Sequence, residues 1–162
     1  MATTQQRDPE WIDQAPIQIR RDVVIEQDVA WVWSQLANNE GWVEWFPGAK
    51  ECRFVSEAPH GRDSVRHVHM DQFKVKERIT RWVPNEQWGM TVMEINAPII
   101  AAMAEEARLT ASGSSTTLTF AIGVELRPIG RLLRRPLVAK QAKALEEGLA
   151  NLAALATKAS AV

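Results

Sequence analysis

Apolar and polar residues alternate where the patterned part of the chain begins, just after residue 16. Apolar side chains stand at every second position, interrupted by one arginine: Ile17, Ile19, Val23 and Ile25. A period of two sends successive side chains to opposite faces of an extended chain, so it is typical of a half-buried strand. We predict a first strand over residues 17–25.

Two short helices are predicted to follow this strand. Asp28 stands where a helix N-cap is expected, and residues 29–36 place most of their apolar side chains on one helical face. An Asn-Asn-Glu-Gly break leads to a second short segment, which carries Trp42 and Trp45 and ends at a proline-glycine pair.

The middle of the chain predicts six further strands separated by turn residues. They cover residues 51–56, 64–70, 73–83, 87–95, 101–111 and 116–126. Strands this close in sequence pair most simply as an antiparallel meander. The segment 101–111 has helical propensity, but it pairs naturally across a Ser-Gly-Ser-Ser loop with the strand that follows.

The C-terminal segment has a helical period. Its apolar residues are spaced by three or four positions and form one stripe: Val138, Ala142, Leu145, Leu149, Leu152 and Ala156. One long helix after a set of sequential strands predicts an α+β fold. Residues 1–15 are polar and without a period, so we expect a mobile N-terminal arm before a single domain over residues 16–160.

Composition and charge exclude several classes of function. A net charge of −1 argues against nucleic-acid binding, and one cysteine, Cys52, excludes an intramolecular disulfide framework. No apolar run reaches the roughly 18 residues that span a bilayer, and the N-terminus lacks the apolar stretch of a secretion signal. We therefore expect a soluble, cytoplasmic protein without stable membrane insertion. The sequence leaves the oligomeric state open.

Several segments, in this order, resemble the START and polyketide cyclase/dehydrase superfamily, also called SRPBCC. They are Val29–Trp33, Trp42–Pro47, Gly61–Arg66, Lys76–Ile79 with Val83-Pro84, Gly113–Thr117 and Leu145–Leu152. The resemblance covers about residues 16–157. It implies a helix-grip fold, in which a curved antiparallel sheet of about seven strands wraps around the long C-terminal helix and leaves a cavity between them. It specifies a fold rather than a function.

Residues on the concave face of that sheet are the candidates for ligand contact. In the strand over residues 73–83, Val75 and Ile79 share a face with Glu77, so this carboxylate is expected to point inward. A buried carboxylate is costly unless it meets a cation or a hydrogen-bond donor, or unless its pKa rises.

The same alternation gives further inward candidates on the other strands. Met103, Glu105 and Phe120 occupy the same alternate positions as the apolar residues of their strands, so they are expected to point inward. Of the two methionines on opposite faces of their strand, Met93 is preferred over Met90 as the cavity residue. The register usual in the resembled family places His67 and His69 inward. The stripe of the last helix adds Leu145 and Leu149.

The tryptophan-rich stretch gives candidates for the mouth of the cavity. Trp42, Trp45 and Phe46 lie in the segment that covers the pocket mouth in related folds, and they are expected either to contact a ligand or to pack. Trp82 and Trp88 flank the Pro84 turn and are expected at the surface or rim.

The titratable candidates allow two interpretations. Glu77 and Glu105, with His67 or His69, would form an acid/base set for aldol-type cyclisation or dehydration. The alternative is a polar patch that orients a ligand without chemistry. The two histidines lack a clear third ligand, so we expect no metal, and no motif indicates a cofactor.

These observations leave three functions open. The leading one is binding or transport of a small hydrophobic molecule: a lipid, a polyketide or an aromatic compound. The second is a cyclase or dehydratase that uses Glu77 and His67 as catalytic residues. The third is an interaction module with a closed core. A run of cations over residues 127–143 suits an anionic membrane, an acidic partner or a solvated face.

Overall fold

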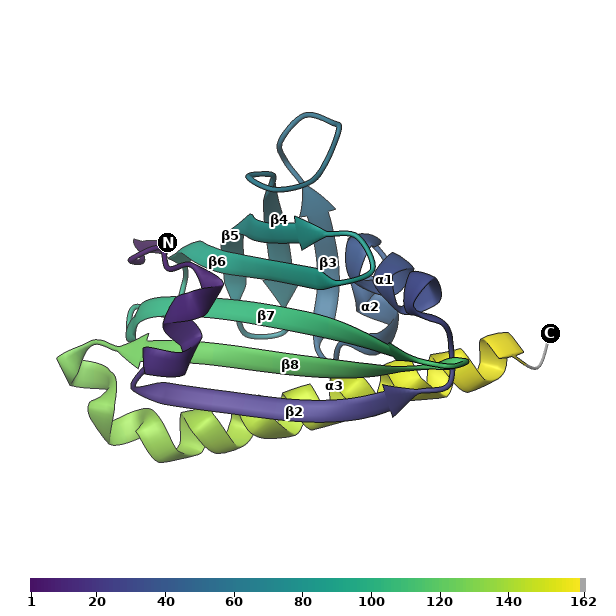
Figure 1. Cartoon of the computed structure of the whole chain (residues 1–162). Helices are drawn as coiled ribbons and strands as arrows, with labels where there is room; N and C mark the ends of the chain where they lie inside the picture. Colours follow the sequence, from purple (N-terminus) through teal and green to yellow (C-terminus); the bar gives the residue numbers. More distant parts are fainter. Residues whose placement is uncertain (161–162) are drawn as a thin grey trace.

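An antiparallel sheet forms the body of the protein, with seven main strands and a short eighth, β1 (Ala2–Thr3), added beside β6 (Figure 1). The computed structural model describes residues 1–160. The main strands are β2 (Ile17–Ile25), β3 (Ala49–Phe54), β4 (Val65–Met70), β5 (Lys74–Val83), β6 (Gln87–Ile95), β7 (Ile100–Ser112) and β8 (Ser115–Leu126). Their order is β2-β8-β7-β6-β5-β4-β3, so the six later strands form a meander and β2 pairs with β8 at the edge. The predicted α+β arrangement is confirmed.

The long helix α3 (Arg134–Ser160) runs along the inner side of this sheet and is preceded by a 3-10 helix, η2 (Pro128–Leu133). Figure 1 shows α3 running beneath and behind the edge strand β2, with its first turns below the start of that strand. Its buried side chains come from the middle and the C-terminal part of the helix: Leu145, Leu149, Leu152 and Ala156. The helix-grip prediction is therefore confirmed.

The predicted short helices are α1 (Val29–Ala37) and α2 (Trp42–Trp45), which connect β2 to β3. Asp28 caps α1 as expected, because its Oδ1 accepts a hydrogen bond of 2.8 Å from the Trp31 backbone amide. Leu36 and Val32 bury the inner face of the helix. These helices close one end of the gap between the sheet and α3.

Trp88 does not lie at the surface or rim. It is 0% exposed and packs 5.1 Å from the Trp42 ring and 6.3 Å from the Phe120 ring, centroid to centroid. The expectation was wrong because the Pro84 turn is followed directly by the central strand β6, which has covered faces. Trp82 is half-buried and stacks edge-on against Trp33.

The N-terminal segment is packed on the outer face of the sheet rather than extending as an arm. It contains β1 (Ala2–Thr3), which pairs with the end of β6, and a 3-10 helix, η1 (Pro9–Gln14), which crosses β7 and β8. Ile12 in η1 is 2% exposed. The Gln5 amide donates to the Ala101 carbonyl at 2.8 Å.

This placement has a structural reason in the sheet. β6 pairs with β7 only through Gln87–Thr91, so the last residues of β6 lack that neighbour. Residues 2–5 occupy the space between the end of β6 and the start of β7, and they supply the backbone hydrogen-bond partners that these strand ends would otherwise lack. No helix within residues 1–160 is long and apolar enough to cross a membrane.

Candidate functional site

A cavity of about 350 Å³ lies between the concave face of the sheet and the N-terminal half of α3. Such a volume falls at the lower end of the range for small-molecule sites. Its lining is mostly apolar. It comprises Trp42, Phe46, Ala49, Arg66, Val68, Met70, Phe73, Val75, Glu77, Val92, Ile95, Ala97, Ile99, Ile100, Met103, Glu105, Ile122, Val124, Leu133, Pro136, Leu137, Lys140 and Gln141.

A buried ion pair contributes the first polar group of this wall. Arg66 of β4 donates from Nε to Glu77 Oε2 of β5 at 2.6 Å, and both side chains are almost fully buried. The two residues are direct cross-strand partners, so the register of the β4–β5 hairpin fixes the contact. Glu77 thus meets the cation that its inward position required.

Arg66 is held from several further sides. Its Nη1 donates to Asn39 Oδ1 at 3.0 Å, and its guanidinium lies 4.5 Å from the Trp42 ring and 4.9 Å from the Trp88 ring. Burial is the largest single influence and disfavours the charge of Arg66, but the neighbouring acidic groups, Glu77 first among them, together outweigh burial and raise the pKa of Arg66. The cation is therefore a fixed feature of the cavity.

Glu105 of β7 supplies a different kind of polar group. Burial raises the pKa of this carboxyl to about 8, and the negative charge of Glu77 adds to the rise while Arg66 opposes it. At neutral pH Glu105 therefore carries its proton and can donate a hydrogen bond. The wall combines an ion pair with a neutral acid.

Cys52 of β3 lies beside this polar group without lining the cavity. Burial raises its pKa to about 11, and Arg66 opposes the rise. The thiol is thus protonated and buried, which is typical of a structural cysteine rather than a nucleophile.

The exposed residues of the lining, Leu133, Pro136 and Lys140, gather around the start of α3, so the mouth of the cavity lies there. Leu133, Pro136 and Leu137 line one side, and the β4–β5 turn lies opposite. Lys140 connects the two sides, because its Nζ donates to Gln72 Oε1 and lies 5.8 Å from the Phe73 ring.

Six predicted ligand-contact residues do line the cavity. They are Trp42, Phe46, Val75, Glu77, Met103 and Glu105. Trp45 instead packs behind Trp42, with ring centroids 4.6 Å apart, and is 1% exposed.

The inward placement of the two histidines is wrong. Arg66, Val68 and Met70 face the cavity, so the alternate residues His67 and His69 face away, and His67 is exposed. The register carried over from the resembled family does not hold for this strand, which has an arginine at a buried, cavity-facing position. His67 is consequently not available as an acid or base in the cavity.

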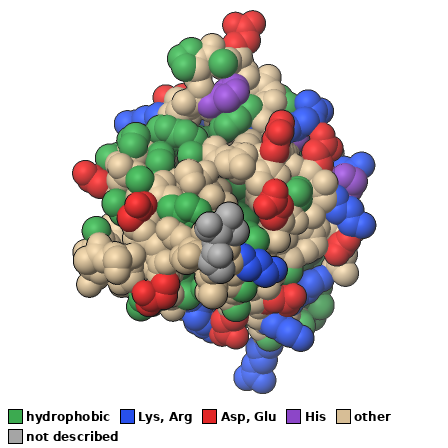
Figure 2. All heavy atoms as spheres, turned by 90° about the vertical axis from the view of Figure 1, so that its right-hand side faces the viewer, with side chains coloured by type: hydrophobic (Ala, Val, Ile, Leu, Met, Phe, Trp, Pro, Cys, Tyr) green, Lys and Arg blue, Asp and Glu red, His purple; other side chains and the backbone are tan. Residues whose placement is uncertain are grey.

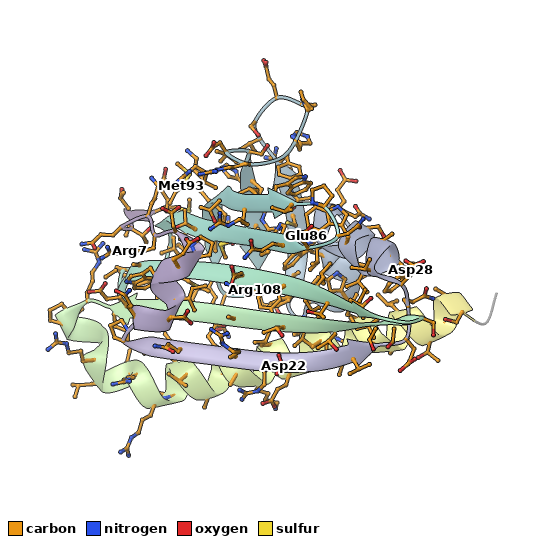
Figure 3. All side chains as sticks on the ribbon, in the orientation of Figure 1. Arg7, Asp22, Asp28, Glu86, Met93 and Arg108 are labelled. Atoms are coloured by element: carbon orange, nitrogen blue, oxygen red, sulfur yellow. The ribbon has the colours of Figure 1, made fainter. Side chains whose placement is uncertain are left out.

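Four other predicted contacts lie outside the cavity lining. Val92 lines the cavity, so Met93 points to the outer side of β6, near the N-terminal segment (Figure 3). Phe120, Leu145 and Leu149 are buried in the hydrophobic core outside the cavity lining. The helix stripe was identified correctly, but only residues before Ala142 reach the cavity.

Sequence reasoning missed Arg66, Asn39 and the residues of the mouth. One signal for Arg66 was available: Val68 and Met70 form the more apolar face of β4, and Glu77 on the next strand needed a cation. Nothing in the sequence placed Asn39 or Leu133 near the cavity. Within the described residues, no group of three His, Cys, Asp or Glu side chains is placed to hold a metal.

Comparison with known proteins adds a family and a fold. The family model described as polyketide cyclase/dehydrase and lipid transport matches residues 16–157. No curated protein sequence matches the chain significantly.

Solved structures resemble this chain at low sequence identity. The Zhui aromatase/cyclase from Streptomyces sp. R1128 has a TM-score of 0.77 and 19% identity, covering 88% of this chain and 94% of its own. A START superfamily protein from Mycobacterium smegmatis has a TM-score of 0.68 and 17% identity, covering 82% and 93%. Ara h 8.0201 has a TM-score of 0.71 and 10% identity, covering 88% and 98%. At these identities the likeness shows the fold alone.

Proposed function

This chain belongs to the polyketide cyclase/dehydrase and lipid transport family, and on that premise we propose that it binds a small apolar molecule carrying one neutral oxygen group, a ketone or a hydroxyl. The family implies hydrophobic ligand binding or cyclase activity. The observation that carries the finer proposal is the composition of the cavity: apolar walls with Arg66, Glu77 and Glu105 as the inner polar groups.

The charge state of these groups favours a neutral ligand. Arg66 is already neutralised by Glu77 at 2.6 Å, so a ligand carboxylate would compete with an existing ion pair. Protonated Glu105 offers one uncommitted donor, which suits a carbonyl or hydroxyl oxygen. A neutral oxygen group would be satisfied there without adding a buried charge.

Binding can be tested with two neutral fluorescent probes, the aromatic ketone prodan and N-phenylnaphthylamine, which has no carbonyl. We expect both to bind the purified chain with blue-shifted emission. Met103→Trp should fill the cavity and abolish binding of both, whereas Val24→Trp, on an exposed part of β2, should leave it unchanged. Circular dichroism verifies that both variants fold. If neither probe binds the wild type, the proposal is wrong.

The role of Glu105 gives a sharper version of this test. Glu105→Leu removes the donor and should weaken prodan binding roughly fivefold, the loss of one hydrogen bond, while N-phenylnaphthylamine is unaffected. Prodan binding to the wild type should also weaken above about pH 8, as Glu105 ionises. Glu105→Gln keeps an N–H donor and should not show this pH dependence.

A second candidate function is dehydration or cyclisation of a polyketone, and the raised pKa of Glu105 favours it. In dehydration, a carboxylate would remove the proton α to a carbonyl, and protonated Glu105 would give its proton to the departing hydroxyl, which leaves as water. Glu77 is the carboxylate within the same cavity. Turnover of a β-hydroxyketone that survives both Glu77→Gln and Glu105→Gln would rule out this assignment.

A further inference from the structure

Three aliphatic side chains project into solvent from η2, the 3-10 helix just before α3. Ile129 is 80% exposed, Leu132 94% and Leu133 50%, and we call these three residues the apolar tip. The other large exposed hydrophobic side chains, such as Val24 and Val43, are separated along the chain. Clustered exposed aliphatic residues indicate a contact surface, whereas single ones are ordinary.

Positive charges flank the apolar tip on both sides in sequence. Residues 127–145 contain six cations, Arg127, Arg131, Arg134, Arg135, Lys140 and Lys143, and no acid. The whole chain has a net charge of −1, so the remainder is negative. Figure 2 shows the opposite end of the molecule, where acidic and basic side chains are mixed.

This cluster of cations works against local helix stability. Arg134 and Arg135 begin α3, where the helix dipole favours negative charge. Arg134 is retained by a hydrogen bond to the Pro16 carbonyl at 2.9 Å, but Arg131 and Arg135 are exposed. Arg131 and Arg135 thus carry charges that disfavour the helix start and, within residues 1–160, have no role in holding the fold. Such charges point to a negatively charged partner outside the molecule.

The apolar tip is fixed to the mouth of the cavity. The Arg127 amide donates to the Ile99 carbonyl at 2.8 Å, and a Cβ on Gly130 would lie 2.9 Å from the Cβ of Ile99, so only glycine permits this approach. Ile99 and Leu133 both line the cavity. A partner whose surface contacts the apolar tip therefore also lies over the mouth of the cavity.

We propose that the apolar tip and the surrounding arginines dock the protein on an anionic lipid bilayer, with the cavity mouth facing the membrane. Aliphatic side chains on a protruding turn suit the boundary between headgroups and acyl chains, and arginines beside them suit anionic headgroups. The docking does not depend on the proposed function. Only its purpose, the exchange of a bound ligand between cavity and bilayer, rests on the proposed function.

Vesicle co-sedimentation of the full chain tests the docking. We expect binding to vesicles with about one-third phosphatidylglycerol, weaker binding in high salt, and little binding to phosphatidylcholine alone. Leu132→Ser should weaken binding roughly tenfold, and Arg131→Gln roughly fivefold. Val24→Ser removes an exposed aliphatic side chain elsewhere and should change nothing.

Three outcomes would overturn the proposal: no binding to anionic vesicles, equal binding to neutral vesicles, or equal effects of Leu132→Ser and Val24→Ser. Binding of an acidic carrier protein through the same residues, without vesicle binding, would assign the surface to a protein partner instead. Probe binding measured on the same protein preparations without vesicles keeps the two proposals separate, because a chain that binds prodan but does not bind vesicles refutes only the docking.

Discussion

Arg66 and Glu77 place two opposite charges in a wall that is otherwise mostly apolar, so each depends on the other. Replacing Glu77 by glutamine leaves the buried guanidinium without its counter-charge. We expect Glu77→Gln to lower the free energy of unfolding by about 3 kcal/mol, measured by urea denaturation. The double variant Arg66→Met, Glu77→Leu should recover most of the loss, because both charges are then absent. Equal stability of Glu77→Gln and the wild type would contradict this.

Glu105 should make stability depend on pH in a defined window. Its pKa is about 8 in the folded protein, above the ordinary value of 4.5, so between these values the unfolded chain releases a proton that the folded chain keeps. The wild type should therefore lose stability relative to Glu105→Gln as pH rises from about 5 to 8, by up to about 1.4 kcal/mol per pH unit. Above about pH 8 the difference should become constant.

Urea denaturation of both proteins across this pH range measures the difference. The Glu105→Gln variant serves as the control, because it shares every other titrating group with the wild type. Parallel stability curves for the two proteins would show that Glu105 titrates normally.

At the scale of elements, α3 has two halves with different tasks. Its C-terminal half buries Leu152 completely, whereas Leu137 in its N-terminal half is half-buried and lines the cavity. We expect Leu152→Ala to cost about 3 kcal/mol of stability and Leu137→Ala less than about 1. Probe binding should respond in the opposite order, with Leu137→Ala weakening it more. Urea denaturation and probe titration of the same two variants check this.

The strands show how far alternation carries a prediction. In β5 the alternation of apolar residues identified Val75 and Glu77 as cavity residues, because the hydrophobic side chains on the same face define the inner face. In β4 neither face is cleanly apolar, since Arg66 occupies an inner position and the histidines occupy outer ones. A period of two gives two faces but does not say which is inside when an ion pair is buried.

At the scale of the molecule, the packed N-terminal segment and the continuous sheet predict cooperative unfolding. The seven tryptophans lie in η1, α1, α2, β5 and β6, so their fluorescence reports on distant parts of the chain. We expect fluorescence and far-UV circular dichroism to give one coincident urea transition, which is the two-state signature of a single domain. An early transition confined to Trp11 would show that η1 detaches by itself, as a mobile arm would.

The sequence by itself determined the order and type of nearly every element from β2 onward, and the inward position of Glu77 and Glu105. Local periodicity, capping and turn chemistry suffice for this, because they act between residues a few positions apart. The tertiary structure decided what those patterns do not contain. It paired Arg66 with Glu77, sealed the gap beside β6 with residues 2–5, and placed Leu133 at the cavity mouth. These are contacts between distant segments, set by strand register and by how α3 crosses the sheet, and no local pattern records them.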